Sequence, residues 1–320
     1  MTFIRYDLDK LVRTDHVLRK INQLISFRNI AISYKDLAKK VGRQGYGLET
    51  GIRCIYLQFH YDLSDRELEE RLQDDLAFRW FCGFSLTDQT PDHTYFCRIR
   101  ALLGTRRLAT MFRKIVQQCA EKKIVRSVFT FVDSSTIVTK VTTWDERDKA
   151  LRTGEEALNN RNINKYAADK DARFGCKGKH KFWFGYKRHV SLDMSSGLIT
   201  KVAATPANVP DHVALKHVCP KAGMVFADKG YCPKLAQETI RKRGCHSGVI
   251  LKNNMKGKNR DKDRWLTKVR MPYEGVFSKK ERRTRYRGLV KVQFQVFMEA
   301  IVHNVKLLVV LEVSPLEQVA

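Results

Sequence analysis

The sequence predicts an α/β protein in which a mixed β-sheet, flanked by helices, is preceded by an all-helical N-terminal domain. Apolar residues recur at helical spacing through the first 122 residues. From residue 123 onward, short runs of β-branched and aromatic residues alternate with helical patterns. Two of these runs are separated only by the turn residues 193–197, which indicates an antiparallel hairpin within the sheet.

The N-terminal helices are marked by apolar periodicity and by capping residues. Ser64, followed by Glu67 three positions later, forms a capping box and predicts a helix start. Pro91 is expected at the first helical position of a later helix. Helices are expected over 17–25 and 48–60, from 64, from 90–91, and over about 106–121. The neighbouring aromatic side chains are interpreted as core rather than as a base-stacking platform: Phe78, Trp80, Phe81 and Phe84.

The second half of the chain supplies the sheet. Strands are expected over 127–132, 182–192, 198–204, 224–227 and 248–251, and helices over about 213–218 and 233–243 and along the C-terminal apolar stripe 294–308. The polar, lysine-rich stretch 140–181 is expected to be a long surface loop or insertion. The predicted domains are therefore 1–122, helical, and 123–311, α/β, followed by a tail at 312–320. This order of elements is similar to that of ribonuclease-H-type domains, which is an analogy of fold alone.

The charge of the chain points to a polyanionic partner. Sixty Lys and Arg residues against 34 Asp and Glu residues give a formal net charge of +26. Such an excess favours nucleic acid, because self-repulsion on this scale is a cost that a partner offsets. No stretch is long and apolar enough to span a membrane, and the start lacks a secretory signal. We therefore expect a cytoplasmic, nucleoid-associated protein with reduced cysteines.

Two aspartates are expected where buried strands end. Asp133 follows the strand at 127–132, and Asp228 follows the strand at 224–227. If these strands are neighbours, the two carboxylates lie side by side and repel each other unless a cation or a proton lies between them. Mg²⁺ suits such a pair, because it prefers hard oxygen ligands and binds through few carboxylates. Each aspartate taken alone is more often a turn residue or a helix cap.

Several segments resemble bacterial insertion-sequence DDE transposases, specifically the insertion-sequence-five group. Ala227-Asp-Lys-Gly-Tyr231 resembles the second-aspartate motif of that group, and Phe131-Val-Asp-Ser-Ser-Thr136 resembles its first-aspartate strand. Further similar segments are 63–70, 78–81, 91–93, 184–190, 197–199 and 205–211. The resemblance covers about residues 45 to 311, and it is the ordered series of segments that makes it specific.

The resemblance also implies a third acid, which the family carries on a helix. Arg270-Met-Pro-Tyr-Glu274 matches the Arg-x3-Glu part of the family pattern, so Glu274 is the expected third metal ligand beside Asp133 and Asp228. Arg270, one helical turn earlier, would face the same side and hold a phosphate. The family's tyrosine and lysine positions are occupied by Thr267 and Glu281. Further expected phosphate contacts are Lys229, Lys280, Arg282 and Arg283, and the segment 252–291 holds 15 Lys and Arg against four acids.

The function implied by the resemblance is metal-dependent cleavage and transfer of DNA strands at the ends of an insertion sequence. Two Mg²⁺ ions, which Mn²⁺ replaces, would be held by the three acids. The partners would be double-stranded element ends and target DNA, with the protein acting as a homo-oligomer. Three alternatives stay open: a hydrolytic Mg²⁺ nuclease of the same fold, a catalytically inactive DNA-binding relic, and a basic RNA-binding structural protein.

Overall fold

The computed structural model describes residues 7–34, 45–139, 144–178, 180–278 and 283–311, with only the backbone described at 275–278. The chain forms two compact units. Unit 1 comprises residues 1–118 and 298–320, and unit 2 comprises residues 119–297. The predicted domain boundary at 122 lies four residues from the change of unit, whereas residues 298–311, which were assigned to the α/β domain, cluster with unit 1.

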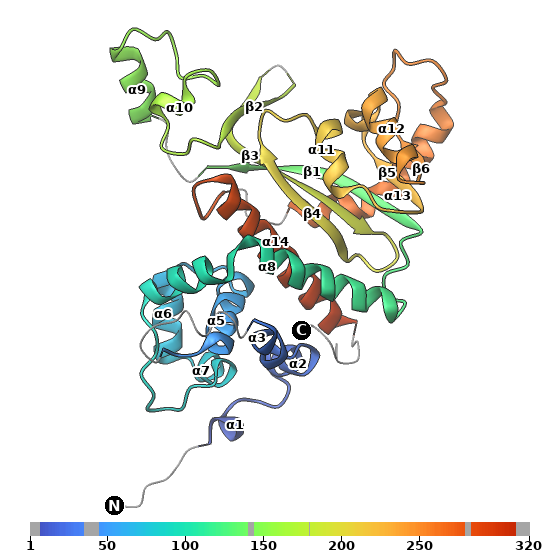
Figure 1. Cartoon of the computed structure of the whole chain (residues 1–320). Helices are drawn as coiled ribbons and strands as arrows, with labels where there is room; N and C mark the ends of the chain where they lie inside the picture. The colour runs from blue at the N-terminus through green and yellow to red at the C-terminus, as the bar shows by residue number, and fades with distance from the viewer. Residues whose placement is uncertain (1–6, 35–44, 140–143, 179, 279–282, 312–320) are drawn as a thin grey trace, which may run out of the picture. The chain divides into compact units, whose positions relative to one another are not determined.

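Unit 1 is helical, as the periodicity predicts (Figure 1). Its helices are α1 (Leu8–Leu11), α2 (Val17–Leu24), α3 (Phe27–Ser33), α5 (Leu48–His60), α6 (Asp65–Asp74), α7 (Leu76–Cys82), most of α8 (His93–Glu121) and the second part of α14 (Leu289–Val310). The helix α8 is broken at Gly104, whose φ of 64° and ψ of 164° are not helical. The two separate helices expected on either side of this residue are therefore a kinked pair.

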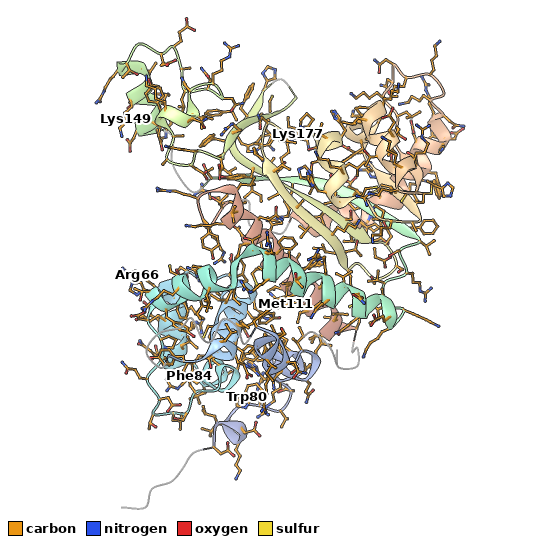
Figure 2. The ribbon with its side chains drawn as sticks, viewed as in Figure 1. Arg66, Trp80, Phe84, Met111, Lys149 and Lys177 are labelled. Carbon is orange, nitrogen blue, oxygen red and sulfur yellow. The ribbon has the colours of Figure 1, made fainter. Side chains whose placement is uncertain are left out.

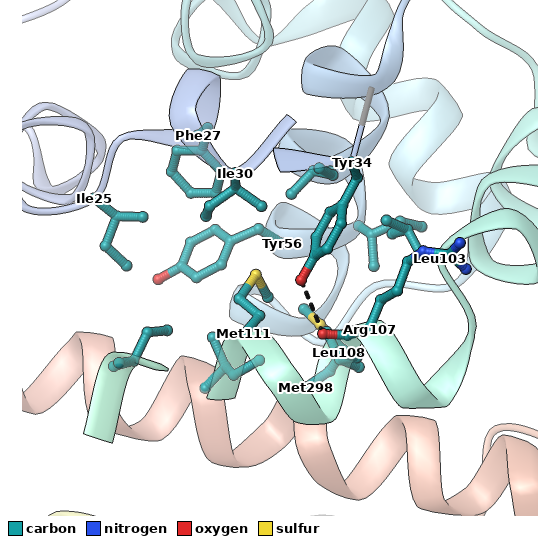
Figure 3. A pocket seen from close by; sticks show the side chains of 14 residues that line it. Ile25, Phe27, Ile30, Tyr34, Tyr56, Leu103, Arg107, Leu108, Met111 and Met298 are labelled. Carbon is teal, nitrogen blue, oxygen red and sulfur yellow. Dashed lines mark hydrogen bonds between the residues drawn. The ribbon is translucent and has the colours of Figure 1, made fainter. Parts of the chain in front are cut away.

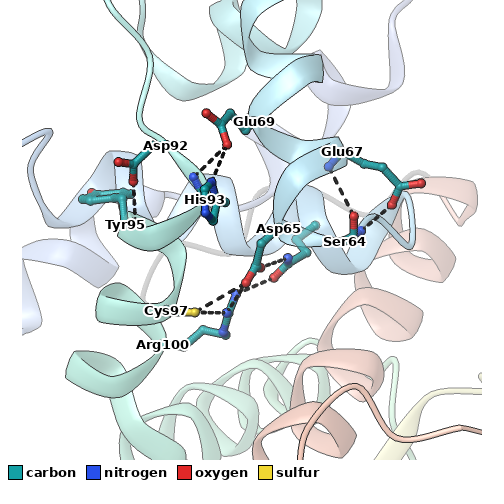
Figure 4. A network of polar contacts seen from close by, with 10 residues as sticks. Ser64, Asp65, Glu67, Glu69, Asp92, His93, Tyr95, Cys97 and Arg100 are labelled. Atoms are coloured by element: carbon teal, nitrogen blue, oxygen red, sulfur yellow. Dashed lines mark hydrogen bonds and ion pairs between the residues drawn. The ribbon is translucent and has the colours of Figure 1, made fainter. Parts of the chain in front are cut away.

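The capping residues of unit 1 explain where its helices begin (Figure 4). The Ser64 hydroxyl accepts the Glu67 N–H at 3.2 Å, and the Glu67 carboxylate accepts the Ser64 N–H at 2.7 Å, which confirms the capping box. The start predicted at Thr90–Pro91 is wrong, because α8 begins at His93. The Asp92 carboxylate accepts the Tyr95 N–H at 3.0 Å and so fixes the first turn after the proline.

The core of unit 1 is built from rings and aliphatic side chains. Phe78, Phe81 and Phe84 are buried, which confirms their interpretation as core, while Trp80 is half-buried under the Arg19 guanidinium. A small apolar pocket lies between the helices and is lined by side chains that include Tyr56, Met111 and Met298 (Figure 3). Because its lining is almost wholly apolar, this pocket is a packing defect of the core rather than a polar binding site.

Unit 2 is built around a mixed sheet. Its strands are β1 (Phe129–Val138), β2 (Arg173–Lys177), β3 (Lys181–Asp193), β4 (Ile199–Pro206), β5 (Met224–Ala227) and β6 (His246–Val249). The hydrogen-bonded path is β2–β3–β1–β5–β6, and β4 also pairs with β3. β3 is antiparallel to β1, β2 and β4, whereas β5 is parallel to β1 and β6. The predicted hairpin and the mixed sheet are confirmed.

Helices cover both faces of this sheet. Val132, Val225 and Ala227 pack with the helices α11 (Asp211–Val218) and α12 (Lys234–Lys242). Successive residues of a strand point to opposite faces, so Phe131 and Phe226 point the other way. There they meet Tyr273 and Trp265 of α13 (Arg260–Ser278), at ring separations of 6.1 Å in both cases. Asp133 and Asp228, two residues further along each strand direction, share this α13 side.

Two sequence predictions for unit 2 are wrong in detail. The first strand was expected to end at Asp133, but β1 continues to Val138 because its second half pairs with β3, with Asp133 opposite Val190. The stretch 140–181 was expected to be a loop, but it contains α9 (Trp144–Arg152), α10 (Ile163–Tyr166) and β2. Polar groups organise it: Asn160 forms two hydrogen bonds with the backbone of Phe174, at 2.8 and 3.0 Å. β6 also begins two residues earlier than expected.

No helix in the described parts of the chain is long and apolar enough to cross a membrane.

Candidate functional site

The two predicted aspartates lie on adjacent strands. The parallel ladder between β1 and β5 ends at the pair Phe131–Phe226, and Asp133 and Asp228 each lie two residues beyond it. β1 remains paired with β3 at Asp133, but it has lost its partner on the β5 side. The first aspartate is therefore held on a continuous strand, while the second follows the end of a strand. The structure brings these two residues together, as the sequence predicts.

Short hydrogen bonds orient both carboxylates. One Asp133 oxygen accepts the N–H of Ser134 at 2.7 Å. One Asp228 oxygen accepts the N–H of Gly230 at 2.8 Å and caps the short 3-10 helix η1 (Lys229–Tyr231). A Cβ at Gly230 would lie 2.9 Å from that oxygen, so a side chain at this position would press on the carboxylate.

The electrostatics of Asp133 show a carboxyl group that is costly to ionise. The pKa of Asp133 is raised to about 6, chiefly by burial and to a smaller extent by the charge of the nearby Asp228 carboxylate. The hydrogen bond from Ser134 and the charges of Arg270 and Lys177 act in the opposite direction and lower the pKa. A raised pKa with a like-charged neighbour indicates that the ionised pair lacks a counter-charge.

Glu274, the third expected acid, lies in α13, which confirms its helical placement. Its side chain is half exposed, and one oxygen lies 3.2 Å from the Arg270 guanidinium. Arg270 is buried and lies over the Phe131 ring, with its guanidinium carbon 5.5 Å from the ring centroid. Arg270 thus links Glu274 to the strand that carries Asp133. Within the described ranges, no group of three or more His, Cys, Asp or Glu side chains is close enough to hold a metal.

The donor set fits a hard divalent cation in part. Two adjacent carboxylates, both half-buried, form the kind of oxygen pair that Mg²⁺ or Mn²⁺ binds. The third carboxylate, Glu274, is ion-paired with Arg270, and the charge of the same arginine also acts on Asp133. The metal-ligand assignment for Asp133, Asp228 and Glu274 therefore stays a prediction.

The expected phosphate-binding residues are distributed unevenly. Lys229 is exposed on η1, directly after Asp228, and Arg283 is exposed where its backbone bridges to Val138 of β1. Lys280 and Arg282 lie outside the described residues. Arg270 is bound to Glu274 rather than free for a phosphate.

Sequence reasoning missed two groups around the aspartates. The Tyr231 side chain is buried, and its pKa is raised first by this burial and then by the charges of Asp211, Asp133 and Asp228. Lys177, at the end of β2, acts on Asp133 from within the segment that was expected to be a loop. A signal for Lys177 was present, because a short basic turn between two aromatic runs is typical of a hairpin.

A mixed sheet of this order, with helices on both faces and two carboxylates at the end of its central parallel pair, defines a ribonuclease-H-like domain of the DDE class. A family model described as "Transposase DDE domain" matches residues 126–305, which is more than half of the chain. A second, "Transposase domain (DUF772)", matches residues 6–102. The chain therefore belongs to the DDE transposases of insertion sequences.

Solved structures with some likeness are also transposases. A piggyBac transposase synaptic complex with hairpin DNA aligns over 95% of this chain and 77% of its own, with 9% identity and a TM-score of 0.40. A Mos1 transposase paired-end complex aligns over 83% of this chain and 80% of its own, with 7% identity and a TM-score of 0.20. At these scores the assignment rests on the family match and on the sheet itself.

Proposed function

We propose that the chain is a Mg²⁺-dependent transposase that cuts DNA at the ends of an insertion sequence and joins the released ends to target DNA. Asp133, Asp228 and Glu274 are its metal ligands. The observation that carries this proposal is the placement of Asp133 and Asp228 just beyond the last pair of the β1–β5 ladder. Two adjacent half-buried carboxylates need a cation to stay ionised together, and phosphodiester chemistry needs a cation at the phosphate.

Two divalent ions bound here would stabilise the charges that develop on the attacking and leaving oxygens of the phosphodiester. The chain's own residues prepare the site. Ser134 and Gly230 fix the two aspartates through their backbone N–H groups. Glu274, whose side chain is half exposed and held by one ion pair, exchanges Arg270 for a cation. Arg270, left beside Asp133, then turns its charge to a DNA phosphate.

The proposed partners follow from charge and from the family. Lys229, Arg270 and Arg283, together with Lys280 and Arg282, contact phosphates of the element ends and of the target duplex. The helical domain, residues 1–122, binds the element ends, and the α/β domain, residues 123–311, carries the chemistry. The protein acts as a homo-oligomer at the nucleoid and belongs to the insertion-sequence-five group. Mn²⁺ replaces Mg²⁺, because both accept carboxylate oxygens.

The test is strand cleavage of a labelled duplex carrying the element ends, in Mg²⁺ or Mn²⁺, by the wild type and by Asp228→Asn. We expect metal-dependent cutting by the wild type and background cutting by the variant. Asp148→Asn is the matched control, because Asp148 is an exposed aspartate of α9 whose one ion pair, to Arg147, is at 3.7 Å. An equal loss of strand cleavage in Asp228→Asn and Asp148→Asn would contradict the assignment of Asp228. Joining of labelled ends into a plasmid separates a transposase from a hydrolytic nuclease.

One observation favours a second candidate, a DNA-binding relic without catalysis. Glu274 pairs with Arg270, and no cluster of three acids forms among the described residues. The relic predicts salt-sensitive DNA binding that Asp228→Asn leaves unchanged, with no cutting by the wild type in either metal. Binding of Mn²⁺ to the wild type, measured by calorimetry and lost in Asp133→Asn, would contradict it.

A further inference from the structure

The hairpin formed by β2 and the start of β3 carries two lysines on one face. Their register places Lys177 directly opposite Lys181, and Cys176 directly opposite Phe182. Directly opposite residues of an antiparallel pair share a face, and residues two apart along a strand share it too. Lys177 and Lys181 therefore lie on the same face as Gly175, and Phe182 lies on the other. Both lysines are exposed, and Lys177 marks the end of β2 in Figure 2.

The lysine face is turned toward the segment that follows β4. A Cβ built at Gly175 would meet the backbone oxygen of Ala207 at 2.7 Å and the Ala207 Cβ at 2.8 Å, so the hairpin lies directly on this segment. A few residues later Asp211 begins α11, and its carboxylate binds the Lys187 ammonium at 2.9 Å. The hairpin is thus packed against the segment that leads into this ion pair.

That segment borders the carboxylate pair. Lys187, the ion-pair partner of Asp211, lies directly opposite Thr136 of β1, three residues along that strand from Asp133. From the hairpin, the positive charge of Lys177 is among those that lower the pKa of Asp133. The lysine face of the hairpin is therefore within electrostatic reach of the proposed catalytic carboxylates.

The two lysines are in an unfavourable arrangement by themselves. Like charges directly opposite each other on a β-ladder are destabilising. Within the described parts of the chain, neither Lys177 nor Lys181 has an acidic partner within ion-pair distance. An anion bound between the two ammonium groups would remove this repulsion, and a DNA phosphate is the anion that the neighbouring site requires.

We propose that Lys177 and Lys181 form a phosphate clamp that holds the backbone of a DNA strand beside Asp133 and Asp228. The clamp rests on the proposed function, since it names the hairpin as the element that positions the strand to be cut. Lysines contribute charge without reading base edges, so the clamp acts on any sequence. The two are positioning residues, and neither of them is a proposed metal ligand.

The test compares Lys177→Ala/Lys181→Ala with a matched pair, Lys221→Ala/Lys242→Ala, which removes two exposed lysines elsewhere in unit 2. Binding of a fluorescent 30-bp duplex is measured in EDTA over a range of salt concentrations. The loss of two phosphate contacts on a duplex lowers the steepness of log K against log salt by about 1.8, and weakens binding at 0.1 M salt by about 60-fold. The thermal midpoint of the hairpin variant is unchanged or higher, because the repulsion is removed.

Two results would overturn the clamp: an unchanged salt slope in the hairpin variant, or an equal fall in the matched pair, which would reflect net charge alone. Because the measurement is made in EDTA, it is independent of catalysis. If the hairpin variant differs from the wild type in salt slope as expected but the wild type never cuts DNA, the proposed function is refuted and the clamp stands. If the wild type cuts DNA but the hairpin variant has the same salt slope as the wild type, the clamp alone is refuted.

Discussion

Asp169 is the buried charge on which the local fold of the 144–193 segment depends, and its removal is the sharpest stability test that the structure offers. Its side chain is almost fully buried. One carboxylate oxygen accepts the Tyr186 hydroxyl at 2.7 Å and the N–H groups of Asp171 and Ala172 at 3.2 and 3.3 Å. The other oxygen accepts the N–H of Gly288 at 3.3 Å. Burial, and then the hydrogen bond to Asp169, raise the pKa of Tyr186.

Asp169→Ala removes the acceptor to which the fully buried Tyr186 hydroxyl donates its proton, so that this donor is left unsatisfied. Hydrogen bonds to a charged group contribute roughly 1.5–3 kcal/mol, and an orphaned buried hydroxyl costs roughly 1–3 kcal/mol. We therefore expect Asp169→Ala to lower the free energy of unfolding by about 3–5 kcal/mol. In a Tyr186→Phe background the orphaned hydroxyl is absent, so the same change should cost about 1–3 kcal/mol less.

The assay is a double-mutant cycle by urea unfolding, followed by tryptophan fluorescence and by circular dichroism. Asp171→Ala is the control, because this neighbouring side chain is exposed and its oxygen accepts one N–H, that of Leu289 at 2.9 Å. A coupling between Asp169 and Tyr186 below about 0.5 kcal/mol would refute the reasoning, since additive losses are typical of independent sites.

Three further changes test the fold. Gly185→Ala should lower the thermal midpoint and reduce the free energy of unfolding by roughly 1–3 kcal/mol, because the new Cβ would lie 2.2 Å from the Ile137 carbonyl oxygen. Burial, with the Lys306 charge, lowers the pKa of His60 to about 3 against an ordinary 6.5. The unfolded chain therefore takes up this proton first, and the free energy of unfolding should fall by about 2 kcal/mol from pH 7.5 to pH 5, a dependence that His60→Gln removes in urea titrations. Arg79→Lys should reduce the free energy of unfolding by about 2–4 kcal/mol in the same titrations. The buried guanidinium donates hydrogen bonds to several backbone carbonyls, and a lysine cannot donate to all of them.

Features set by neighbouring residues could be predicted from the sequence. The capping box at Ser64 and Glu67 forms within one helical turn, so no distant contact is needed to recognise it. The β3–β4 hairpin is closed by a five-residue turn, and the strand leading to Asp228 is a short apolar run. The helix around Glu274, by contrast, was expected from the resemblance to the family, which carries its third acid on a helix.

Features set by distant partners could not be predicted. The polar residues after Asp133 look like the end of a strand, but β3 pairs with them from more than fifty residues away and extends β1 to Val138. Arg270 and Glu274 were correctly placed on one side of a helix, yet their pairing depends on the Phe131 ring that fixes the guanidinium. Polar side chains such as Asn160 fold the 144–178 segment by binding backbone groups, which hydrophobic periodicity does not detect.

The division of α14 between the two units has a consequence for how the protein is made. The residues that complete the core of unit 1 include Met298, Ile301, Val305 and Leu308, which are buried and lie near the end of the chain. A ribosome extends the chain at roughly 5–20 residues per second, and N-terminal segments normally fold first. Here the N-terminal helices must wait, with apolar surface exposed, until residues 298–308 have been synthesised. Premature termination before residue 298 would therefore leave an aggregation-prone fragment rather than a free DNA-binding module.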